Sequence, residues 1–157
     1  IWIRYEFTFG LMGILAIFHD VIILVGVFAF TQKEFTMTIL AALLTLVGYS
    51  INDTIVIYDR IREDLKIYRK DPVPLIFNRA MNKTLSRTVI TSGTTLVTSL
   101  ALYFFGGPVI HDFALAMSLG VIIGTYSSIF IASNLVLETF VHTKMEKKAL
   151  KQLTKKK

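Results

Sequence analysis

An aspartate and an arginine in two separate apolar runs are the residues of this sequence best placed to do chemistry together. Asp53 follows Phe35 by about 18 residues, and Arg87 precedes Phe105 by about 18 residues. In α-helices at ~1.5 Å per residue, both side chains then lie roughly 27 Å from the same end of their helices. If the two helices are neighbours, Asp53 and Arg87 could pair, and the carboxyl group could exchange a proton when that pairing changes.

A purely structural role explains the same two residues equally well. The long side chain of Arg87 could extend to the polar end of its helix, while Asp53 forms a hydrogen bond to a neighbouring helix. Residue types and spacing leave both interpretations open.

Other polar residues interrupt the apolar runs. His19 and Asp20 lie near the middle of the first run, where a charged side chain costs at least ~2.5–3.5 kcal/mol, so we expect them to face other helices. They could fix helix packing or take part in ion movement. Asn52 precedes Asp53, and a face of hydroxyl groups follows Arg87 along its helix, either as interhelical hydrogen bonds or as a water path: Thr91, Thr95 and Thr98.

The elements that must position these residues are membrane-spanning helices. Of the 157 residues, 54% are hydrophobic, far more than a soluble domain needs for its core. They are concentrated in four runs, each close to the ~17–25 residues that span a bilayer. The runs cover residues 7–30, 35–57, 88–105 and 113–141. The sequence therefore predicts an all-α fold, a polytopic helical bundle in a membrane.

The basic residues predict the orientation of this bundle. The formal net charge is +6, and most Lys and Arg lie in segments 58–87 and 143–157. The opposite connections, 31–34 and 106–112, contain Lys33 alone. By the positive-inside rule the basic segments and both chain ends are cytoplasmic, which explains the charge better than binding to nucleic acid does. The basic tail should also contact anionic lipids.

We divide the chain into three parts on this basis. Residues 1–7 are the expected cytoplasmic end of a truncated helix, residues 8–142 the membrane domain with a cytoplasmic amphipathic loop at 58–87, and residues 143–157 a basic tail. Within the loop, Asp71 and Pro72 predict an N-cap and the first turn of a short helix. In the fourth run, small residues at four-residue intervals predict close helix contact: Gly120, Gly124 and Ser128.

Several kinds of chemistry have no support in the sequence. There is no cysteine, and no nucleotide-binding loop, metal-ligand spacing or nucleophile elbow is present. We therefore expect no enzyme activity, no metal and no cofactor. Energy would come from an ion gradient or from a partner.

One long motif carries a family resemblance. The sequence GYSINDTIVIYDRIRE at 48–63 resembles the SecD/SecF family of bacterial protein-export membrane subunits in the RND superfamily. Segments 16–22, 86–96 and 105–109 match the same family in the same order, so the resemblance covers most of the chain. It implies an RND-type half-bundle, the C-terminal membrane half of a SecF-type subunit. The first span, the extracytoplasmic domain and most of the second span of such a subunit would be missing.

The resemblance also implies a function. Subunits of this kind act with SecD and the SecYEG channel in the bacterial inner membrane, where they use the proton-motive force to promote export of a translocating preprotein. Asp53 and Arg87 match the family's functional aspartate and arginine, which implies a proton pathway with protons as the coupling ion. Two alternatives are an RND-type transporter of small molecules or lipids and a membrane scaffold without coupling.

Overall fold

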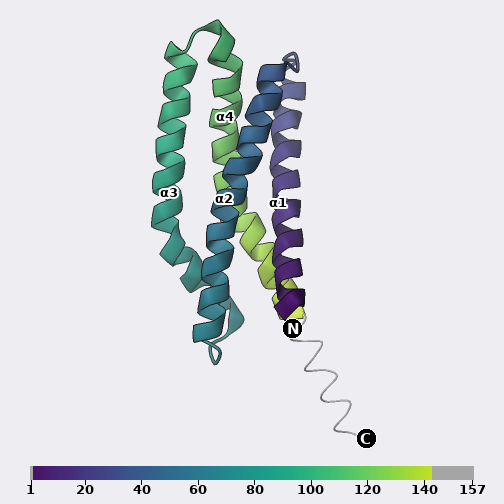
Figure 1. Cartoon of the computed structure of the whole chain (residues 1–157), viewed down its shortest axis with the longest axis vertical. Helices are drawn as coiled ribbons and strands as arrows, with labels where there is room; N and C mark the ends of the chain where they lie inside the picture. Colours follow the sequence, from purple (N-terminus) through teal and green to yellow (C-terminus); the bar gives the residue numbers. More distant parts are fainter. Residues whose placement is uncertain (1, 143–157) are drawn as a thin grey trace, which may run out of the picture.

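Four long helices make up the part of the chain that the structure describes (Figure 1). The computed structural model describes residues 2–142, with side chains from residue 7 onward. The helices are α1 (Trp2–Phe30), α2 (Met37–Ile67), α3 (Val73–Phe105) and α4 (Pro108–Tyr126), and a π-helical segment, η1 (Ser127–Ala132), continues α4 into helical residues 133–142. All four are long and apolar enough to cross a membrane. The predicted all-α fold with four spans is confirmed.

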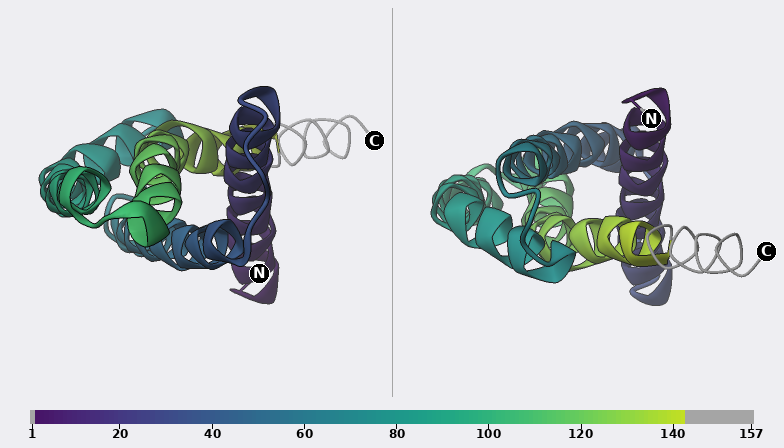
Figure 2. Two further views of the ribbon diagram at one scale, coloured as in Figure 1. Left: turned by 90° about the horizontal axis from the view of Figure 1, so that it is seen from above. Right: turned by 90° about the horizontal axis from the view of Figure 1, so that it is seen from below.

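The helices run alternately up and down, with α2 and α4 between the outer helices α1 and α3 (Figures 1 and 2). The α1–α2 and α3–α4 connections lie at one end of the bundle. The start of α1 lies at the other end, where α2 ends and α3 begins. This end is called the α2–α3 end below. Polar residues near the middle of α2 are therefore within reach of the other helices.

Two clusters of buried side chains hold the bundle together. Near the α2–α3 end, the rings of Phe9, Tyr58, Phe77 and Phe140 pack with centroids 5.0–5.9 Å apart. The second cluster, toward the opposite end, joins α1, α2 and α4 around Leu46 and other apolar residues. Many further large apolar side chains are exposed on the outside of the bundle. Lipid or a partner helix would cover this apolar surface.

Small residues let α4 approach α2 closely. A Cβ atom placed on Gly120 would lie 2.8 Å from Leu46 Cδ1, and one on Gly124 would lie 3.5 Å from Ser50 Cβ. Further along, the hydroxyl groups of Ser128 and Thr54 lie 3.0 Å apart in a hydrogen bond. The three small residues of the fourth run therefore face α2, where larger side chains would separate the two helices.

The structure differs from the expected loop at 58–87. Helix α2 continues through Ile67, and α3 begins at Val73 and enters the third apolar run without a break. No Pro or Gly interrupts residues 75–92, so nothing ends the helix there. The predicted N-cap is also wrong, because Pro72 holds that position and Asp71 instead accepts a hydrogen bond of 3.2 Å from Arg79.

The apolar face of this segment nevertheless packs as its spacing indicates. Val73, Phe77 and Ala80 are buried in the aromatic cluster at the α2–α3 end, beneath the bundle. Helix α1 is continuous from Trp2 onward, and the division expected at residues 7–8 stays a prediction. The basic tail at 143–157 lies outside the described residues and remains a prediction.

Candidate functional site

Asp53 and Arg87 lie near each other but not in contact. Asp53 is 4% exposed, and its Oδ2 atom has no hydrogen-bond partner among the described residues. Arg87, on α3, is exposed in this chain, yet its charge interacts electrostatically with the Asp53 carboxyl group. No ion pair within 4.0 Å joins them in the described part of the chain. Asp53 and Arg87 therefore lie at one site, as predicted, but they do not form an ion pair.

Two residues that sequence reasoning missed complete this site, Tyr49 of α2 and Thr125 of α4. The buried hydroxyl group of Tyr49 interacts electrostatically with Asp53 and lies beside the hydroxyl groups of Thr91, Thr95 and Thr125. The four-residue spacing between Tyr49 and Asp53 places them one turn apart on the same helix face, which was the available signal. Nothing local to the fourth run points to Thr125.

The threonine hydroxyl groups already donate to their own helices. Thr91 Oγ1 donates to the carbonyl oxygen of Arg87 at 2.9 Å, and Thr95 Oγ1 donates to that of Thr91 at 2.8 Å. Thr125 Oγ1 donates to the carbonyl oxygen of Val121 at 2.7 Å. Each hydroxyl oxygen therefore offers its lone pairs, as an acceptor, toward Tyr49.

Two of the predicted polar candidates do not join this site. Asn52 is exposed on the outer side of α2. Thr98 is also exposed, and its hydroxyl group donates to the carbonyl oxygen of Thr94 at 2.9 Å. Asn52 faces away because one residue along a helix turns the side chain by about 100° from that of Asp53. Thr98 is three residues beyond Thr95, which turns its side chain by about 60° and out of the site.

His19 and Asp20 belong to a second polar network, between α1, α2 and η1. Asp20 is 1% exposed; its Oδ1 atom lies 3.2 Å from His19 Nδ1, and its Oδ2 atom accepts a hydrogen bond of 2.7 Å from Ser50 Oγ. Ser128 Oγ in turn donates to the Ser50 carbonyl oxygen at 3.4 Å. Ser50 therefore links α1 to α2 and α2 to η1, one turn from Asp53.

Replacing Ser50 with alanine should destabilise the bundle by about 1–3 kcal/mol, because it leaves a buried carboxylate oxygen of Asp20 without its partner. Unfolding of the complete subunit in lipid bicelles measures the loss. Thr45→Ala is the control, since the exposed Thr45 hydroxyl bonds only to its own helix at the Ala41 carbonyl oxygen. Equal effects of the two substitutions would show that the Ser50–Asp20 bond contributes nothing specific.

A charged cluster at the α2–α3 end ties α3 to α2. Asp64 is fully buried, and both of its carboxylate oxygens accept hydrogen bonds of 3.0 Å from Lys83 Nζ. Arg79 lies over the Tyr68 ring, 4.2 Å from its centroid. Since Lys83 and Arg87 are one turn apart, the Asp64–Lys83 bond fixes the part of α3 that carries Arg87.

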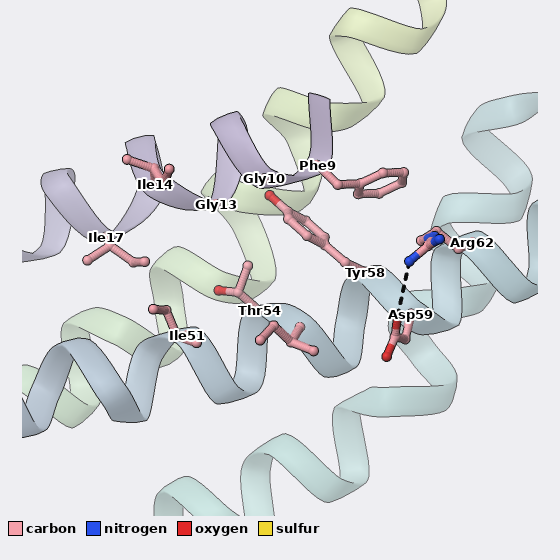
Figure 3. Close-up of a pocket in the computed structure, with 11 residues that line it drawn as sticks. Phe9, Gly10, Gly13, Ile14, Ile17, Ile51, Thr54, Tyr58, Asp59 and Arg62 are labelled. Carbon is pink, nitrogen blue, oxygen red and sulfur yellow. Dashed lines mark ion pairs between the residues drawn. The ribbon is translucent and has the colours of Figure 1, made fainter. Parts of the chain in front are cut away.

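An open groove of about 370 Å³ lies between α1 and α2 (Figure 3). Its walls are mostly apolar and include Gly10 and Gly13 of α1, with the side chains of Thr54 and Tyr58 on the α2 side. The ion pair of Asp59 and Arg62, 3.7 Å long, lies at one end. Neither Asp53 nor Arg87 lines the groove, so it is separate from the site between α2, α3 and α4.

Comparison with known proteins gives a consistent result. The family model described as "Protein export membrane protein SecD/SecF, C-terminal" matches residues 1–142. Protein translocase subunit SecF of Koribacter versatilis is 49% identical over 137 residues, covering 87% of this chain and 34% of that protein. SecF of Desulfurispirillum indicum is 51% identical over 140 residues, covering 87% of this chain and 45% of that protein.

Two crystal structures of SecDF share the fold. One, in the super-membrane-facing form, has a TM-score of 0.89 at 50% identity and covers 94% of this chain and 20% of its own. The other, from Thermus thermophilus, has a TM-score of 0.82 at 52% identity, with 88% and 19% covered. The chain thus spans less than half the length of these relatives. Over the part that it spans, this multi-pass membrane chain belongs to the SecD/SecF family of protein-export membrane proteins.

Proposed function

We propose that the chain is the C-terminal membrane half of a SecF-type subunit of the Sec translocase. With SecD and the SecYEG channel, it would use the proton-motive force to promote the export of preproteins across the bacterial inner membrane. The names of the relatives and the family model support the translocase role. The buried Asp53 beside Arg87 supports proton coupling.

The single observation that carries this proposal is the environment of Asp53. A carboxyl group in the middle of membrane-length helices, with one oxygen unpartnered among the described residues, is costly to keep unless the site uses it. Protonation removes its charge, and the nearby Arg87 guanidinium favours the charged form. Asp53 would therefore bind and release the proton, and Arg87 would set the balance between the two states.

Coupling requires that this change reach the rest of the subunit. Asp53 lies on α2, whose other faces pack closely on α4 at Gly120 and bond to α1 through Ser50. A change in the Asp53–Arg87 distance would move α3 against this packed unit. In the complete subunit, we propose that the movement is passed to an extracytoplasmic domain that holds the exported protein.

Orientation and lipid contacts belong to the same proposal. The described N-terminal residues and the α2–α3 end lie on the same side of the bundle (Figure 1), which supports a cytoplasmic location for both. The C-terminus would then be cytoplasmic too, since the chain crosses four times, and its basic tail would contact anionic lipid.

The test is gradient-dependent release of a preprotein from vesicles that contain the complete SecF-type subunit, SecD and SecYEG. We expect Asp53→Asn to abolish the dependence on the proton gradient, because the amide cannot exchange a proton. Asp59→Asn is the matched control, since Asp59 lies on the same helix with its side chain 69% exposed. Expression and complex formation should be the same for both variants.

Each outcome separates the candidates. Loss of gradient dependence in Asp53→Asn alone supports proton coupling at this site. Unchanged release in both variants would instead favour a scaffold, with coupling elsewhere. Flux of a small molecule or lipid through vesicles without SecYEG would favour an RND-type transporter.

A further inference from the structure

Tyr49 presents a buried hydroxyl group to the site of Asp53. The two residues are four apart on α2, which places them one turn apart on the same face of the helix. Both Tyr49 Oη and Asp53 Oδ2 are enclosed, and neither forms a direct hydrogen bond within the described part of the chain. Buried polar atoms in proteins almost always have a protein or water partner. Because Tyr49 and Asp53 lie one turn apart on one helix, the two atoms can share one hydrogen-bonded arrangement.

The groups around Tyr49 determine which way its hydrogen bonds run. The hydroxyl groups of Thr91, Thr95 and Thr125 use their hydrogens on backbone carbonyl oxygens of their own helices. With their hydrogens placed in this way, they accept a hydrogen bond from Tyr49. When the Tyr49 hydroxyl hydrogen points to them, its oxygen lone pairs remain available to a donor on the Asp53 side.

We infer that Tyr49 is a positioning residue for proton exchange at Asp53. Its oxygen accepts from the protonated carboxyl group, directly or through one water molecule, and its hydroxyl hydrogen goes to the threonines of α3 and α4. Such a chain of bonds holds the carboxyl group in one orientation and links it to α3, the helix of Arg87. This inference rests on the proposed function of Asp53.

Tyr58 provides a matched control. It lies on the same helix, nine residues further along, and its hydroxyl group donates to the carbonyl oxygen of Ala132 at 3.0 Å. Tyr49→Phe and Tyr58→Phe therefore each remove one buried hydroxyl group and keep the ring. Only the first change affects the site of Asp53.

The experiment compares both variants in the complete subunit with SecD. Infrared difference spectra on acidification should contain a carbonyl band of the protonated Asp53, identified by its loss in Asp53→Asn. In Tyr49→Phe we expect this band to move to higher wavenumber, since the carboxyl group loses a hydrogen-bond partner. Gradient-dependent release of preprotein should fall by roughly tenfold, the size expected for one hydrogen bond.

Tyr58→Phe should lower stability and leave both the band and the gradient dependence unchanged. A double variant, Thr91→Val with Thr95→Val, should move the band in the same direction. If Tyr49→Phe does not fold, this double variant tests the inference in its place. The inference requires both the band shift and the slower release, and failure of either overturns it. The proposed function is tested separately by Asp53→Asn, whose result does not depend on Tyr49.

Discussion

Replacing Lys83 with methionine is expected to lower the free energy of unfolding by about 3 kcal/mol. The substitution removes the ammonium group that bonds to both oxygens of the fully buried Asp64, and leaves as its cationic partner Arg60, whose Nε atom lies 3.6 Å from Oδ1. Breaking a buried ion pair from one side costs about 3–5 kcal/mol, and the value here should be at the lower end because Lys83 is 33% exposed. Titration of the complete subunit with denaturing detergent in lipid bicelles measures the loss.

The control uses an exposed ion pair on α2, the helix of Asp64. Arg60 donates to Glu63 at 2.7 Å, and the Glu63 side chain is 55% exposed, so Glu63→Gln should cost only about 0–1 kcal/mol. Adding Asp64→Leu to Lys83→Met should recover part of the stability, because no unpaired carboxylate remains. If Lys83→Met were as mild as Glu63→Gln, the Asp64–Lys83 bond would not hold α3 to α2.

Gly120→Ala is the second substitution with a large expected effect. The new Cβ would lie 2.8 Å from Leu46 Cδ1, and Leu46 is itself fully buried and cannot move aside easily. Overpacking of this kind costs about 1–3 kcal/mol. Gly120→Val should cost more, because its two methyl groups extend further into α2. Unfolding in lipid bicelles measures both variants.

Gly124→Ala is the matched control, because Gly124 is the next small residue of α4 that faces α2. Its Cβ would lie 3.5 Å from Ser50 Cβ, an ordinary contact, so the better helix propensity of alanine should make it neutral or stabilising by up to ~1 kcal/mol. Leu46→Ala combined with Gly120→Ala should be less harmful than the sum of the two changes. Equal stability of Gly120→Ala and Gly124→Ala would contradict the close α2–α4 contact.

These two contacts are also relevant to coupling. The Gly120–Leu46 contact holds α2 and α4 together, whereas the Asp64–Lys83 bond holds α3 to α2 one turn before Arg87. Of the four candidate spans, the most apolar stretch of α3 has the smallest share of its residues buried within this chain. Beyond Lys83, α3 therefore leaves more of its surface to lipid or partner helices than the other spans do, and a change at Asp53 could shift this part while the Asp64–Lys83 bond holds its start.

The number and type of helices could be predicted from the sequence. Four apolar runs of membrane length became four helices, because hydrophobicity and length are local properties that a bilayer selects directly. The similar depth of Asp53 and Arg87 followed from counting residues at a constant rise per residue. The small residues of the fourth run indicated a close contact, although not that α2 would be the partner.

The tertiary structure alone decided which helix faces meet. It brought Thr125 of α4 to Tyr49, turned Asn52 and Thr98 outward, and left Asp53 and Arg87 near each other without an ion pair. It also joined the short helix expected after Pro72 to the third apolar run, so that the two form the single helix α3. The rotation and neighbours of a helix depend on side chains from other helices, distant in sequence, so local spacing determines a helix without determining what it touches.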